Sequence, residues 1–199
     1  FALMFVYMGV IYWSIRGFGA EAQAAYGVGS RVMQAVFLPA MAVAFAAAPL
    51  AGQNMGAGRH DRVRETFRTA ATLGSAMMLA LTLFCQVRPE LLIRGFTDQP
   101  EVDALGGEFL QIISWNFVAV GIVFTCTGMF QALGNTLPGL ASASSRVVTF
   151  ALPAIWLSTR PGFALPHLWY VSVASMGIQA VLSWWLVRRQ LRDRLPATA

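Results

Sequence analysis

The sequence has no lysine and few charged residues of either sign. Charged residues make up 12% of the 199 residues and hydrophobic residues 57%, whereas typical soluble domains carry about 25% charged residues. A soluble protein of this composition would have too few polar side chains to cover its surface. The composition therefore excludes an ordinary soluble domain and favours a protein that spans a membrane.

Residues that carry catalysis or bind metals are also scarce. The sequence has two histidines and two cysteines, and Cys85 and Cys126 lie far apart inside apolar runs. Such cysteines are typical of small buried side chains rather than of a disulfide or a metal site. All nine acidic residues lie in polar segments or near the ends of apolar runs. Because no carboxylate is placed to relay a proton within a membrane, we expect neither an enzyme nor a bound metal or cofactor.

The net charge of +5 comes from arginines that gather at the ends of the apolar runs. A nucleic-acid interface would instead place basic residues with aromatic residues on one polar face. Anionic lipid headgroups are the better match for arginines in these positions. The sequence therefore predicts the lipid bilayer as a partner and no nucleic acid.

Six apolar runs divide the chain. A membrane-spanning helix needs about 20 apolar residues, and most of the runs approach or exceed that length. They predict an all-α membrane protein, a bundle of six transmembrane helices within residues 1–194, with a tail at 195–199. The expected spans are residues 1–15, 24–50, 69–87, 109–133, 140–158 and 165–187. Because the first run is short and the chain does not start with Met, we expect a fragment of a longer protein.

Charge at the ends of the runs predicts the orientation. Residues 59–68 and 188–194 are strongly basic, and an alternating count of six spans places both on the same side. The acidic segment 90–108 falls on the other side. Since arginines near span ends resist translocation, the sequence predicts a multi-pass plasma-membrane protein with segment 59–68 and the C-terminus in the cytoplasm.

The stretch between the second and third runs is expected to turn on glycines and then to form a basic loop. Pro49 and Gly52 would end the second span, because glycine lets the backbone leave a helix. We interpret this stretch as a structural element without chemistry of its own. Its structural residues would be Gly52, Gln53, Asn54, Gly56 and Gly58.

Polar side chains inside the runs are the candidates for a binding surface. Asn116, Val120, Val123 and Thr127 recur at three- and four-residue steps and so share one face of a helix. Polar residues of this kind either hydrogen-bond between helices or line a wet cavity. Arg146, the one charge deep in a span, either snorkels to the interface or faces a cavity. The candidate cavity residues are Gln34, Asn116, Thr127, Gln131 and Arg146.

Three motifs resemble those of a known family. They are AYGVGSR at 25–31, GQNMGAG at 52–58, and FQALGNT at 130–136 with Pro138. Their order and spacing look like the C-terminal half of a multidrug and toxic compound extrusion (MATE) transporter. The resemblance implies a twelve-helix protein of two six-helix bundles, with the N-terminal half as this chain's partner. It also implies export of cationic or amphipathic compounds in exchange for protons or sodium ions.

The chain departs from some members of that family. Those members bind the coupling cation through acidic residues in the spans that correspond to residues 1–15 and 109–133, and neither segment contains one. The chain therefore looks closer to the branch that resembles the DNA-damage-inducible transporters, whose coupling acid lies in the other half. The choice between H⁺ and Na⁺ stays open.

These features predict secondary active multidrug efflux, in which two bundles rock around a central cavity. Gln34 and Asn116 would be the first residues to contact substrate on this half. Two alternatives remain. One is a lipid-linked precursor flippase of the same superfamily, for which Arg146 is the only supporting residue. The other is a membrane fragment that transports nothing.

Overall fold

The computed structural model describes residues 2–93, 95 and 100–195, and in this part of the chain every regular element is a helix. The prediction of an all-α fold is confirmed. In chain order, the elements are α1 (Ala2–Ile15), η1 (Arg16–Phe18), α2 (Gly19–Gly56), α3 (His60–Val87), α4 (Pro89–Ile93), α5 (Pro100–Ile113), α6 (Asn116–Ala132), α7 (Leu137–Ser158) and α8 (Leu165–Arg194).

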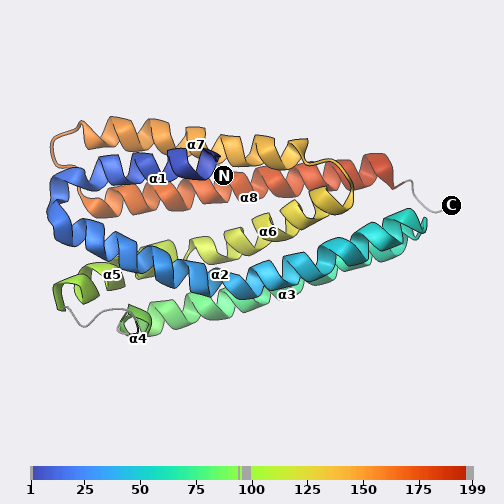
Figure 1. Ribbon diagram of the computed structural model, residues 1–199, viewed down its shortest axis with the longest axis horizontal. Helices are drawn as coiled ribbons and strands as arrows, with labels where there is room; N and C mark the ends of the chain where they lie inside the picture. Colours follow the sequence, from blue (N-terminus) through green and yellow to red (C-terminus); the bar gives the residue numbers. More distant parts are fainter. Residues whose placement is uncertain (1, 94, 96–99, 196–199) are drawn as a thin grey trace.

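The helices form an elongated bundle of two groups. Figure 1 shows α1, α7 and α8 side by side on one edge and α2 with α3 on the other, while α6 crosses between them. Helix α6 packs against α2, α3 and α8, so it holds the two groups together. The beginning of α3 and the end of α8 meet at one end of the bundle, where Arg64 Nη2 donates to the Leu195 carbonyl.

The chain reverses between α1 and α2. A short 3-10 turn leads to Gly19, whose φ of 87° is a backbone conformation that favours glycine. By length and hydropathy, four helical stretches of the described residues could cross a membrane, or five if the bent α5–α6 pair is one span. That count takes Ala2–Gly56 as one stretch, although Figure 1 shows α1 and α2 running in opposite directions. Counted separately, α1 has 14 residues and is shorter than the roughly 20 that a full span needs.

The second predicted span was expected to end at Gly52, and this is wrong. Helix α2 continues for another turn to Gly56, and the chain turns at Ala57–Arg59, where Gly58 has a φ of 68°. A Cβ at Gly52 would lie 3.8 Å from the carbonyl oxygen of Ala132, an ordinary van der Waals distance, so α2 passes beside the end of α6 there while it remains helical. Only Gly58 among the predicted loop glycines acts through its backbone conformation.

The basic segment 59–68 is not a loop, as the sequence had suggested, but the first turns of α3. Val63 and Phe67 are buried on one face of these turns, with 0% and 4% exposure. Two arginines on the other faces form pairs with acids one turn away, Arg62 with Glu65 at 3.1 Å and Arg64 with Asp61 at 3.2 Å. This amphipathic pattern makes the segment helical.

The fourth predicted span is broken rather than continuous. Segments Ala104–Ile113 and Asn116–Ala132 meet at an angle of 55°. Two side chains of α3 hold the break: Thr82 Oγ1 lies 3.0 Å from the Ser114 carbonyl, and Gln86 Nε2 donates to Ser114 Oγ at 2.8 Å. The Ser114 carbonyl, which also accepts from the Phe117 N–H at 3.0 Å, and the Ser114 hydroxyl thus each have a polar partner on a neighbouring helix.

The remaining ends differ from expectation in two places. Helix α8 runs to Arg194, past the predicted end at residue 187, because Val187 and Leu191 remain buried at 0% and 7% exposure. The segment predicted at 90–108 as a polar connection contains α4 and the first part of α5. Asp98, within that segment, lies outside the described residues, as do residues 196–199 of the predicted tail.

Candidate substrate cavity

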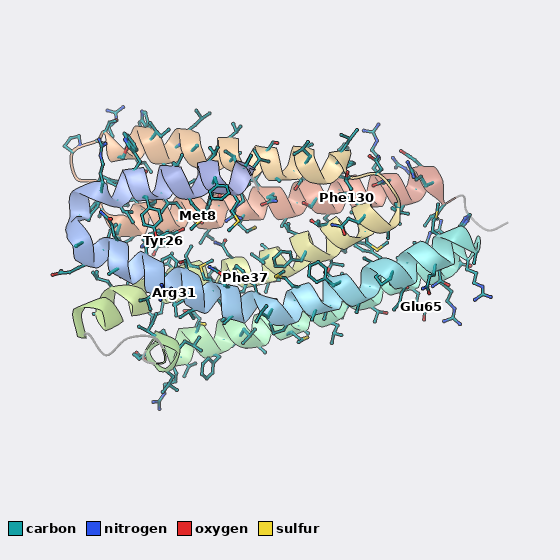
Figure 2. The ribbon with its side chains drawn as sticks, in the orientation of Figure 1. Met8, Tyr26, Arg31, Phe37, Glu65 and Phe130 are labelled. Carbon is teal, nitrogen blue, oxygen red and sulfur yellow. The ribbon has the colours of Figure 1, made fainter. Side chains whose placement is uncertain are left out.

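Helices α2 and α6 form the closest contact near the candidate cavity residues. A side chain at Gly128 would lie 3.0 Å from the Ala44 carbonyl, so the two backbones almost touch there. Further along, the ring of Phe37 on α2, labelled in Figure 2, lies edge-on to the rings of Phe117 and Phe124 on α6, with ring centres 5.7 Å and 6.3 Å apart. These contacts fix which faces of the two helices meet.

Gln34 and Asn116 lie on the same side of this contact. Gln34 precedes Phe37 by three residues, a rotation of about 60° around α2. Val43, by contrast, lines a groove that α2 shares with α3. On α6, Gly121 packs against α3, where an added side chain would meet Met78 at 3.1 Å, and Asn116 is turned about 140° away from it. Both polar side chains therefore belong to the side of the α2–α6 pair that faces away from α3.

Asn116 is buried without a hydrogen-bond partner. Its exposure is 2%, and neither Nδ2 nor Oδ1 has a partner among the described residues. An amide in this state costs about 1–3 kcal/mol relative to one that is hydrogen-bonded. Asn116 is also the first residue of α6, directly after the break. An unsatisfied amide at a helix break is a feature that calls for a functional reason.

The other candidates on α6 become more exposed along the helix. Thr127 is half-buried and donates to the Val123 carbonyl at 2.8 Å, so its hydroxyl is satisfied within the helix. Gln131 and Gln34 are exposed. The structure thus gathers Asn116 and Thr127 on one face, as predicted from their spacing, and leaves the two glutamines on the surface. A role of these four residues in binding stays a prediction.

Arg146 lies in a polar cluster that three helices build. Its Nη2 donates to Tyr7 Oη at 3.1 Å, and its guanidinium lies 4.5 Å from the centre of the Tyr7 ring. Tyr7 Oη is hydrogen-bonded to Ser172 Oγ at 2.9 Å, and the ring packs against Phe150 at 4.5 Å. Arg146 is half-buried and its Nε is buried without a partner. The side chain points into the bundle, which favours an interior position over snorkelling to the interface.

The sequence reasoning missed Tyr7 and Ser172. They lie 139 residues before and 26 residues after Arg146, on α1 and α8, and no periodicity within one helix relates residues on different helices. The available signal was their type, since a tyrosine and a serine inside apolar runs need partners. That signal does not say which partner.

The polar cluster continues along the seam between α7 and α8. Ser142 and Ser183 are hydrogen-bonded across it. Because the two helices are antiparallel (Figure 1), four residues onward from Ser142 and four back from Ser183 set Arg146 opposite Gln179. Gln179 is 7% exposed, and its Oε1 is buried without a partner. The unsatisfied acceptor of Gln179 is thus level with the unsatisfied donor of Arg146.

The residues of the three motifs serve packing and helix ends. Tyr26, labelled in Figure 2, stacks on Trp169 with ring centres 5.7 Å apart and planes at 7°, and a side chain at Gly29 would overlap the ring of Phe109. Gly134 closes α6 with a φ of 67°. In the GQNMGAG motif, Asn54 donates to the Leu50 carbonyl at 2.8 Å. These contacts give each motif a structural reason.

Within the residues that the structure describes, no three His, Cys, Asp or Glu side chains lie together in a way that could hold a metal ion. The polar groups described above, around Asn116 and along the α7–α8 seam, are amides, hydroxyls and the Arg146 guanidinium, set among apolar side chains. Such groups offer a ligand weak, adaptable contacts.

Comparison with known proteins decides the family. The family model MatE matches residues 1–157. This chain belongs to the MatE family. Its relatives include the probable multidrug resistance protein NorM of Thermotoga maritima, 28% identical over 142 residues that cover 71% of this chain and 31% of NorM. They also include the probable multidrug resistance protein YpnP of Bacillus subtilis, 28% identical over 155 residues that cover 78% of this chain and 33% of YpnP.

Solved structures of MATE transporters have the same fold. The bent form of the Vibrio cholerae transporter VcmN matches 97% of this chain with a TM-score of 0.88 at 23% identity, over 44% of its own length. An inward-facing multidrug resistance MATE transporter of the MOP superfamily matches 100% of this chain with a TM-score of 0.82 at 15% identity, over 45% of its own length. The chain thus spans about a third of its curated relatives and less than half of these structures.

Membership of the MatE family confirms the family that the three motifs predicted, and the relatives described above are named as probable multidrug resistance proteins. The partial coverage agrees with a chain that corresponds to one half of such a protein. The assignment to the C-terminal half rests on the three motifs of the sequence.

Proposed function

We propose that this chain forms one half of a secondary active exporter of amphipathic or cationic compounds, driven by antiport of H⁺ or Na⁺. The N-terminal six-helix half would be its partner, and the two halves would expose a shared cavity alternately to the two sides of the membrane. The observation that carries the proposal is the buried, unsatisfied amide of Asn116 on the side of α2–α6 that also holds Gln34. The names of the relatives support multidrug resistance as the setting.

Substrate binding would combine this polar pair with apolar area. Exposed polar side chains on apolar helices are costly against lipid, so Gln34 and Gln131 are expected to face the cavity or the other half. Asn116 would supply the deepest hydrogen-bonding group, and its lack of a protein partner leaves both its donor and its acceptor for a ligand. The coupling ion would bind in the other half, because residues 1–15 and 109–133 contain no carboxylate.

The charge distribution supports a plasma-membrane protein with this end of the bundle in the cytoplasm. The beginning of α3 and the end of α8, which carry several arginines, lie at the same end of the bundle in Figure 1, and Arg64 donates to the Leu195 carbonyl there. Positive charge next to spans marks the cytoplasmic side. The chain would therefore keep 59–68 and its C-terminus inside the cell.

Dye efflux from cells tests the proposal. The full-length parent protein would be expressed in cells that lack their main exporters, and ethidium loss would be followed at low sodium with and without a protonophore. We expect energy-dependent efflux that the protonophore abolishes if H⁺ is the coupling ion, or that added sodium restores if Na⁺ is. Absence of efflux from a well-expressed, inserted protein would contradict the proposal.

Arg146 bears on the flippase alternative. A flippase for a lipid-linked precursor would need cationic groups open to a pyrophosphate. Arg146 instead donates to Tyr7 and lies over its ring. Because these contacts already occupy the guanidinium, Arg146 gives little support to the flippase function.

A further inference from the structure

A furrow between α3 and α8 has a basic end and an apolar remainder. At the end of the bundle where α3 begins and α8 ends, four arginines surround a groove of about 400 Å³ that also contains Trp184 and Phe67. Its arginines are Arg64, Arg68, Arg188 and Arg192. None of the described residues that line the groove is acidic. The groove therefore combines concentrated positive charge with an aromatic wall.

The apolar side chains of this groove are fixed in place. Phe67 is 4% exposed and packs against Trp184 with ring centres 5.0 Å apart. The Arg188 guanidinium lies 4.8 Å from the centre of the Trp184 ring. Arg64 is tied down by Asp61 and by the Leu195 carbonyl. Arg68 and Arg188 are exposed at the rim, where they can reach an anion without breaking an ion pair with an acid.

A second, apolar groove of about 580 Å³ continues from the first. The two share Trp184. The continuation is lined by Ala71, Thr72 and Ser75 of α3, by Ala180 and Val181 of α8, and by Ile122 of α6. These residues lie one to two helical turns deeper in the apolar part of each helix than the arginines do. The furrow thus runs from a cationic mouth at the end of the spans into the depth of the membrane.

We propose that this furrow binds one anionic phospholipid of the adjacent leaflet, with the phosphate headgroup between Arg68 and Arg188 and an acyl chain in the apolar continuation. Other ligands would fit only one part of the furrow. A free phosphate would use only the arginines, and a zwitterionic lipid would leave the cationic mouth unbalanced. Basic pockets between membrane helices, next to interfacial Trp, suit anionic headgroups. The site does not depend on the transport activity proposed above.

Lipid retention by the purified full-length parent protein tests this site. The protein in detergent would be offered phosphatidylglycerol or phosphatidylcholine vesicle lipid, and bound lipid would be measured by native mass spectrometry and by thermal stability. We expect phosphatidylglycerol to bind and stabilise more than phosphatidylcholine. The double variant Arg68→Gln/Arg188→Gln should lower the affinity for phosphatidylglycerol by roughly 30-fold, the effect expected for two arginines near a charged headgroup.

The control is the double variant Arg62→Gln/Arg189→Gln, which removes the same charge from the same two helices outside this furrow. It should retain phosphatidylglycerol. A second variant, Val181→Phe, fills the apolar continuation at a position that is 72% exposed, so the fold should tolerate it. It should lower retention while every arginine remains. Equal loss in the control, no preference between the two lipids, or full competition by millimolar inorganic phosphate would each overturn the proposal.

Discussion

At the residue scale, a substitution of Asn116 distinguishes a structural role of this side chain from a role in binding. A side chain that holds helices together makes hydrogen bonds, and this amide makes none within the described residues. Replacement by leucine of similar volume removes the cost of about 1 kcal/mol or more that an unsatisfied buried amide carries. We predict that Asn116→Leu in the full-length protein keeps or raises the melting temperature in detergent while ethidium efflux falls.

The matched control for this variant is Thr125→Val. Thr125 is also buried on α6, at 2% exposure, but its hydroxyl donates to the Gly121 carbonyl at 3.0 Å. It should leave efflux near that of the parent. A clear drop in melting temperature for Asn116→Leu, with efflux unchanged, would show that Asn116 is structural.

Tyr7 is predicted to hold Arg146 inside the bundle. Tyr7→Phe keeps the ring that packs on Phe150 and lies under the guanidinium, but removes the hydroxyl between Arg146 and Ser172. We expect a loss of about 1–2 kcal/mol in the free energy of unfolding, because a charged donor loses its acceptor. Chemical unfolding of the purified protein measures it. Tyr170→Phe, at an exposed tyrosine of α8, is the control, and equal stability of both variants would contradict the prediction.

At the scale of elements, the contact between α2 and α6 depends on a missing side chain. A Cβ at Gly128 would lie 3.0 Å from the Ala44 carbonyl and 3.6 Å from the Ala48 Cβ. We predict that Gly128→Val destabilises the protein by about 1–3 kcal/mol, the range for overpacking, and that this appears as a lower melting temperature. Gly177→Val on α8, where no neighbour lies within 4 Å, should change it much less. Similar losses in both would mean that the helix contact is looser than described.

The break between α5 and α6 is also an element-scale feature with a test. Thr82 and Gln86 of α3 bond to Ser114 at the break. We predict that the double variant Thr82→Val/Gln86→Leu raises amide hydrogen exchange at residues 114–117, because the break loses the contacts that tie it to α3 and opens locally more often. Exchange in α7 should not change. Unaltered exchange at the break would show that its geometry is set within α5–α6 themselves.

Much of the helical arrangement could be predicted from hydrophobic runs, and the errors have physical causes. Six apolar runs gave the helical segments because burial in lipid selects them. Glycine and a run of arginines are typical of a turn and a loop, and they led to that prediction for 52–68. The four-residue spacing of the buried Val63 and Phe67 instead indicates a helix. The break at 114–115 has no proline or glycine to mark it. The side chains that bond to it, Thr82 and Gln86, lie on another helix.

For the candidate site, the sequence predicts which residues of one helix share a face, but not which residues of different helices meet. The shared face of Asn116 and Thr127 follows from their spacing, and the structure retains it. The neighbours of Arg146 on α1 and α8 do not follow from any local pattern, because Tyr7 is 139 residues away in sequence. Sequence reasoning found the residues whose chemistry is unusual for a membrane helix, and packing decided which of them are satisfied.

At the scale of the whole molecule, this segment is expected to depend on its partner half. Gln34 and Gln131 are exposed on otherwise apolar helices, a costly state against lipid. We predict that residues 1–199 expressed without the other half are degraded or aggregate, and that co-expression of the other half rescues them. Size-exclusion chromatography and limited proteolysis measure both outcomes. A monodisperse, protease-resistant product of residues 1–199 alone would contradict this.

The most direct test of the central claim, that the α2–α6 side faces substrate, is protection of an introduced cysteine. Cys85 and Cys126 are buried at 0% exposure, so their labelling background is low. In full-length protein with no cysteine in the other half, maleimide labelling of Gln34→Cys would be timed with and without ethidium. Ala35→Cys, exposed one residue onward and about 100° around α2, is the control. Ethidium should slow labelling at Gln34→Cys and not at Ala35→Cys. A labelling rate at Gln34→Cys that ethidium leaves unchanged, or that it lowers by the same factor as at Ala35→Cys, would contradict the account.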